Sequence, residues 1–170
     1  LRHRGMSTRE TVVNDPRYAT SVTLQTMVNS MLFFDDPKDH MRQRRLVGQA
    51  FTGQTVSGLQ PFVETLVNRL LDDCIERGRF DFMHDFVENI PVAVICQMLG
   101  VPDEDIETFR EWNFLITSAT GVNLPSDHLA KVDAATTSLN AYLAALLEER
   151  TANPRDDLIT RLIEARDNDD

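Results

Sequence analysis

The sequence predicts an all-α protein, and three observations support that fold class. Long stretches repeat apolar residues every three or four positions, as one face of a helix requires. Glycine and proline interrupt these stretches at short intervals. Strong two-residue alternation, typical of strands, is missing beyond a short stretch near Thr11. The chain should therefore consist mainly of helices joined by short connections.

The N-terminal part is the least regular. Residues 9–13 could form a short helix or strand, closed by the following Asp-Pro turn, because a residue before proline avoids helical angles. Residues 18–30 are rich in Thr, Ser and Asn, and we expect a long loop there with about one helical turn. Asp36 and Pro37 suit the cap and first position of the next helix, which should stop near Gly53.

Two helices follow. The clearest periodicity runs over residues 57–77, and Gly78 after it suits a left-handed cap. Residues 80–86 lead into a further helix, whose early part is constrained by Pro91 and which ends at residues 100–102.

The C-terminal part predicts three more helices. Asp103 should cap the first, a loop should cover residues 117–127, and a second long helix should run over residues 129–150 before Pro154 breaks it. A short helix follows near the end. The residues expected to face inward are Ile106, Phe109, Trp112 and Ile116 in the first helix, Val132, Leu139, Leu143, Leu146 and Leu147 in the second, and Leu158, Leu162 and Ile163 in the last.

Composition narrows the possible partners. The chain has 170 residues, enough for one domain with a sizeable core, and 17 Lys plus Arg against 27 Asp plus Glu give a net charge of −10. An acidic chain repels nucleic acid and anionic lipid. No apolar run approaches the roughly 20 residues that span a bilayer, and no signal-peptide core follows the N-terminus. We expect a cytoplasmic protein with neither nucleic acid nor membrane as a partner.

The two cysteines give no sign of a metal site. Cys74 and Cys96 lie in no Cys-x-x-Cys motif and at no metal-ligand spacing. Free cysteines are among the most buried residues, so we expect two buried thiols in a reducing compartment.

A basic segment over residues 36–47 (DPKDHMRQRRLV) stands out in this acidic chain. His40 and Arg44 are four positions apart and share one helix face. Arginine can bind a carboxylate through paired hydrogen bonds, and a histidine ring nitrogen can donate another. The two propionates of haem would suit such a pair. The alternative is a solvated basic face with internal salt bridges.

This segment, followed by residues 50–52 (AFT), resembles the helix C region of bacterial cytochrome P-450 enzymes, which are haem-thiolate monooxygenases. The resemblance implies that His40 and Arg44 contact the propionates of haem b. Further segments match in the family's order: residues 14–18 (NDPRY), residues 99–102 (LGVP) with Phe109-x-x-Trp112, and residues 154–159 (PRDDLI). Together they cover nearly the whole chain.

The resemblance implies an incomplete domain. Residues 1–170 would form the region of helices B to H of the cytochrome P-450 fold, roughly the first half of a member without its extreme N-terminus. The oxygen-binding helix and the loop with the cysteine ligand of iron are missing, and neither Cys74 nor Cys96 resembles that loop. Glu107 and Arg110 have the spacing of the family's core Glu-x-x-Arg pair, but we interpret them as a surface ion pair.

The resemblance also implies a function. The complete enzyme would insert one oxygen atom of O₂ into a small organic, lipophilic substrate, with electrons from a ferredoxin or flavodoxin-type donor. Arg42 and Arg45 would face that donor, or would be ordinary surface arginines. The chain itself holds no catalytic residue and no iron ligand, so we expect it to be inactive alone. In the family, the loop between helices B and C and the region between helices F and G line the substrate pocket. The residues of this chain that fall in the corresponding segments are the pocket candidates Met27, Val28, Met31, Leu32, Leu115, Thr117 and Val122.

Two alternatives stay open at this point. A haem-free relative that binds and supports a partner enzyme would also lack the cysteine loop, although retention of His40 and Arg44 counts against it. An unrelated helical binding module would match the motifs by accident, and it would form a compact antiparallel bundle with a sealed core.

Overall fold

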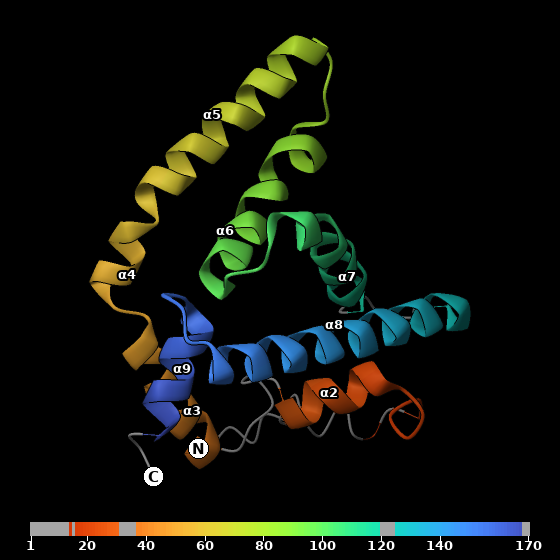
Figure 1. Cartoon of the computed structure of the whole chain (residues 1–170). Coiled ribbons are helices and arrows are strands. Elements are labelled where there is room, and N and C mark those ends of the chain that lie inside the picture. The colour runs from red at the N-terminus through yellow and green to blue at the C-terminus, as the bar shows by residue number, and fades with distance from the viewer. Residues whose placement is uncertain (1–13, 15, 31–36, 120–124, 168–170) are drawn as a thin grey trace, which may run out of the picture. The chain divides into compact units, whose positions relative to one another are not determined.

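The computed structural model describes residues 14, 16–30, 37–119 and 125–167, and it is helical with no strand among them (Figure 1). The all-α prediction is confirmed. The helices are α2 (Val22–Ser30), α3 (Pro37–Ala50), α4 (Gly53–Gly58), α5 (Gln60–Arg77), the π-helix η2 (Phe82–Val87), α6 (Asn89–Leu99), the 3₁₀-helix η3 (Asp103–Asp105), α7 (Ile106–Ser118), α8 (Ser126–Ala152) and α9 (Leu158–Asp167). None of these described helices is both long and apolar enough to cross a bilayer.

The chain divides into two compact units. Unit 1 comprises residues 1–47 and 111–146, and unit 2 comprises residues 48–110 and 147–170.

The helices with clear periodicity and glycine ends are confirmed. Helix α5 buries Leu66 and Cys74 and ends at Gly78 in the left-handed conformation, with φ of 68°. Helix α6 ends in the same way at Gly100, with φ of 67°. Glycine adopts this conformation without the steric cost that a Cβ brings, so both helix ends are encoded locally.

Several details of the predicted elements are wrong. A separate short helix, α4, occupies Gly53–Gly58, so the helix expected over residues 57–77 begins at Gln60. Residues 18–30 contain a nine-residue helix, α2, where we expected mostly loop. Asp103 makes no cap hydrogen bond and instead opens the 3₁₀-turn before α7. Leu147, expected to face inward, is 42% exposed. The α2 and Asp103 segments are short and polar or acidic, and their conformation depends on tertiary contacts that local periodicity does not report. Residues 9–13 and Asp36 lie outside the described residues.

Unit 2 is built on a small apolar core and a buried ion pair. Ala50, Met98 and Leu158 form the core, with partly buried Leu59, Val94, Leu99 and Leu162 packed against it.

The ion pair joins Arg150 at the end of α8 to Asp157 before α9, and the two residues are only 2% and 6% exposed. Arg150 Nη2 also donates to the Gly100 carbonyl oxygen at 2.8 Å. Asp157 Oδ1 accepts from the Thr160 amide at 2.9 Å, which caps α9. One guanidinium thus connects the ends of α6, α8 and the start of α9.

Gly100 and Gly78 allow a matched test of this packing. A Cβ on Gly100 would lie 2.6 Å from Asp157 Oδ2 and 2.8 Å from Arg150 Nη2, whereas a Cβ on Gly78 would meet nothing within 4 Å. Gly78→Ala should therefore lose about 1–2 kcal/mol of unfolding free energy, the left-handed strain alone. Gly100→Ala should lose about 1–3 kcal/mol more through overpacking. Urea denaturation measures both, and equal losses would contradict the assigned packing.

In unit 1, α2 and α7 both contact α8. On α8, Asp133, Thr136 and Asn140 bond to residues of the α2 segment, while Tyr142 stacks edge-on against Trp112 of α7 with ring centroids 5.8 Å apart. Ser118 Oγ lies 2.7 Å from His128 Nε2, which adds a second α7–α8 contact. At 100° per residue these two sets lie roughly 130° apart around α8. Helix α8 therefore supports α2 and α7 on different faces (Figure 1).

Candidate haem-propionate site

The basic segment folds as the predicted helix α3, which begins at Pro37. His40 is half-buried and Arg44 is exposed, one helical turn further along. Arg42 and Arg45 are also exposed. Arg42 lies about 200° around the helix from His40, so it points to a different side. The helix thus presents an imidazole and a guanidinium together and carries two further arginines on another side.

This donor set fits two carboxylates on one ligand. Arginine is always charged and binds a carboxylate with two parallel hydrogen bonds. A histidine one turn away adds one N–H donor. The partial exposure of both side chains leaves them accessible. The chemistry of these residues therefore fits the acid groups of haem.

The two cysteines lie on other helices, and the burial of both disfavours ligation of iron. Cys74 on α5 and Cys96 on α6 are free, buried thiols, as predicted. Burial raises the pKa of Cys96 to about 11, so this thiol stays protonated at neutral pH. Within the described ranges no group of three or more His, Cys, Asp or Glu side chains could hold a metal ion.

Glu107 and Arg110 form an ion pair at 2.5 Å, with 64% and 31% of their side chains exposed. Arg110 also donates to Asn89 Oδ1 at 2.9 Å. The interpretation of this pair as a surface contact is confirmed.

The substrate-pocket candidates fall on two helices. Met27 and Val28 lie in α2, but the structure does not describe their side chains. Leu115 is half-buried and Thr117 exposed on α7, where Thr117 Oγ1 donates to the Asn113 carbonyl at 2.8 Å. Both helices contact α8, and no described contact brings the candidates themselves together. Met31, Leu32 and Val122 lie outside the described residues.

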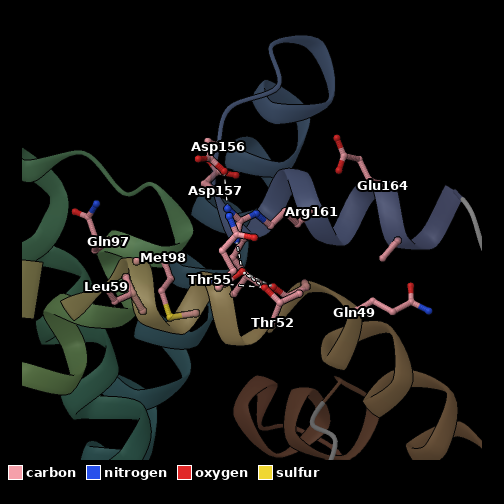
Figure 2. Close-up of a pocket in the computed structure, with 15 residues that line it drawn as sticks. Gln49, Thr52, Thr55, Leu59, Gln97, Met98, Asp156, Asp157, Arg161 and Glu164 are labelled. Carbon is pink, nitrogen blue, oxygen red and sulfur yellow. Dashed lines mark hydrogen bonds and ion pairs between the residues drawn. The ribbon is translucent and has the colours of Figure 1, made fainter. Parts of the chain in front are cut away.

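A groove of about 830 Å³ lies in unit 2 between α4, α6 and α9 (Figure 2). Its floor is the apolar core, and its rim is polar. Arg161 on the rim donates to Thr55 Oγ1 at 2.6 Å and pairs with Asp156 at 2.5 Å. Because these partners already engage the guanidinium, the groove does not present an open anion site.

Sequence reasoning missed two polar contacts that organise the units. The first is the burial of Arg150 with Asp157, although the DDL motif was recognised as a family feature. The second is the bond between Asp133 and the start of α2. The Asp133 contact joins segments about 110 residues apart, and the Arg150 pair spans a helix end that also contacts Gly100, 50 residues away, so local periodicity reports neither.

No family model matches the chain. Among curated proteins, a vitamin D(3) 25-hydroxylase of Pseudonocardia autotrophica is 35% identical over 139 residues, covering 82% of this chain and 33% of that protein. A mycinamicin IV hydroxylase/epoxidase of Micromonospora griseorubida is 34% identical over 149 residues, covering 87% and 36%. The chain spans about a third of the length of these relatives.

Solved structures agree with the sequence matches. Ligand-free cytochrome P-450 TbtJ1 superposes with a TM-score of 0.74 and 33% identity, covering 92% of this chain and 41% of that one. The mixed-function cytochrome P-450 MycG gives a TM-score of 0.72 and 33% identity, covering 85% and 36%. Similarity of this extent, in both sequence and helix arrangement, excludes an accidental motif match. The chain belongs to the bacterial cytochrome P-450 family.

Proposed function

We propose that the chain is a partial cytochrome P-450 domain, the region of helices B to H, of a haem-dependent monooxygenase. The observation that carries this proposal is the basic helix α3, with His40 and Arg44 on one face, inside a fold shared with such proteins. The complete protein would insert one oxygen atom of O₂ into a small organic substrate.

His40 and Arg44 would bind the two haem propionates and so fix the orientation of the porphyrin. Haem, when bound, supplies the activation of molecular oxygen. The thiolate that ligates its iron must come from outside these residues, because the two cysteines here are buried in helices α5 and α6.

The class of substrate is inferred from the reactions named for the relatives. Their names describe hydroxylation of vitamin D(3) and hydroxylation or epoxidation of mycinamicin IV. We infer a lipophilic small molecule, contacted from α2, α7 and their flanking segments by the candidate residues Met27, Val28, Met31, Leu32, Leu115, Thr117 and Val122.

The electrons would come from a ferredoxin or flavodoxin-type protein. The exposed guanidinium groups of Arg42 and Arg45 would steer such an acidic donor, since complementary charge raises association rates.

The isolated 170-residue chain should not bind haem tightly. With propionate ligands but no axial thiolate, it lacks the strongest bond that holds haem-thiolate iron. Titration with haemin, followed by reduction under carbon monoxide, tests this expectation. A spectrum of the thiolate-ligated carbon monoxide complex from the chain alone would contradict it.

The isolated chain should also expose apolar surface. Ile75, Phe82 and Met83, at the α5–η2 end of unit 2, are 73%, 58% and 55% exposed. Exposed apolar side chains bind hydrophobic dyes and promote self-association. We expect the chain to raise the fluorescence of such a dye, and Ile75→Ser together with Phe82→Ser to reduce that signal. A monomer that leaves the dye silent would contradict the proposed partial domain.

A further inference from the structure

The first turn of α2 is held by a residue of another helix. Asp133 Oδ1 on α8 accepts hydrogen bonds from Ser21 Oγ at 2.8 Å and from the Thr23 amide at 2.9 Å. Ser21 Oγ in turn accepts from the Leu24 amide at 3.2 Å. Two backbone donors that the helix start leaves open are thus satisfied in different ways: the Thr23 amide by Asp133, about 110 residues along the chain, and the Leu24 amide by the local Ser21 hydroxyl, which Asp133 in turn holds.

The contact between α2 and α8 is polar and buried. Ser21 and Thr23 are each 1% exposed, and Thr136 is 3% exposed. Thr23 Oγ1 and Thr136 Oγ1 share a hydrogen bond at 2.8 Å, and Thr136 Oγ1 also lies within donating distance of the Val132 carbonyl, at 2.9 Å. Such a network is favourable only while each buried group keeps its partner, because an unsatisfied group retains its desolvation cost.

Helix α2 has little stability of its own. It spans nine residues, with no acidic residue in its first turn and no basic residue in its last. Val, Thr, Asn and Ser, which fill much of it, are weak helix formers. Isolated helices shorter than about 12–15 residues are marginal in water even with better sequences.

We propose that α2 is helical only while it is docked on α8, and that the Asp133 carboxylate holds it there. The segment then has two states, docked and helical or undocked and unfolded. Folding and docking of α2 are then one event, since Asp133 Oδ1 bonds both the Thr23 amide of the helix start and the Ser21 hydroxyl that caps the Leu24 amide. The undocked state exposes the backbone of residues 21–30. The inference concerns the position of α2 and holds independently of haem or substrate.

Amide hydrogen exchange on the 170-residue chain tests whether Asp133 keeps α2 helical. In Asp133→Ala, the amides of residues 25–30 should lose protection together, by about 10-fold or more, as expected for losing hydrogen bonds to a charged group. Protection in α5 and α6 should stay unchanged. Asp133→Asn keeps a carbonyl acceptor and should retain most of the protection. Glu148→Ala removes an equal charge from an exposed site on the same helix and serves as the matched control.

Three results would overturn the proposal. Protection of α2 that persists in Asp133→Ala would show that the helix does not need the Asp133 carboxylate. A loss spread equally over α5 and α6 would show a general effect on stability. Equal losses in the Ala and Asn variants would show that the hydrogen-bond acceptor at position 133 is not what holds α2.

Discussion

Arg150→Ala is expected to lower the free energy of unfolding by about 3–5 kcal/mol, because removing one partner of a buried ion pair leaves the other charge uncompensated. Asp157 would remain almost fully buried at 6% exposure without its guanidinium. The Gly100 carbonyl would lose its 2.8 Å donor at the same time. Chemical denaturation followed by circular dichroism measures the change.

Arg166→Ala provides the control for this variant. Arg166 pairs with the adjacent Asp167, and about 58% of its side chain is exposed. Surface pairs contribute about 0–1 kcal/mol, so this variant should unfold close to wild type. A small effect of Arg150→Ala, equal to that of Arg166→Ala, would mean that the Arg150 network does not hold α6, α8 and α9 together.

The double variant His40→Ala, Arg44→Ala is expected to weaken haem binding of the complete protein by about 100-fold or more. Hydrogen bonds to charged groups contribute about 1.5–3 kcal/mol each, and both propionates would lose a partner. Haem affinity is measured by transfer of haem to an acceptor protein. Because α3 is surface-exposed at Arg44, the variant should retain its helical content.

Arg42→Ala is the matched control within the same helix. It removes an equal charge two positions from His40, on another side of α3. Haem affinity should stay close to wild type, while association with an acidic electron donor should slow at low ionic strength. Equal losses of haem from Arg42→Ala and the double variant would remove the specific role of His40 and Arg44.

The sequence predicted those helices whose determinants are local. Helix α5 has a continuous apolar stripe and a glycine end, and α6 has a proline in its first turn and a glycine end, so their positions needed no tertiary information. Helix α2 was not found in this way, because its local cap, Ser21, stands before a short run of weak helix formers, and the Asp133 carboxylate that bonds Ser21 and the Thr23 amide lies on another helix. Polar residues typical of a loop are here the partners of a buried interface.

The same distinction applies to the site. The spacing of His40 and Arg44 is visible in the sequence, and the structure confirms that both lie on one helix. Their ligand could not be predicted from spacing, because a solvated basic face has the same pattern; the family resemblance was needed to choose haem. The burial of Arg150 was not predictable either, since an arginine near a helix C-terminus is usually exposed.

The carbon monoxide spectrum of the protein expressed from the complete reading frame tests the central claim most directly. If these residues are part of a haem-thiolate monooxygenase, the reduced protein will show the absorption of thiolate-ligated haem. A protein that contains no haem, or whose spectrum lacks the thiolate signature, would contradict that function and would favour a haem-free helper within the same family.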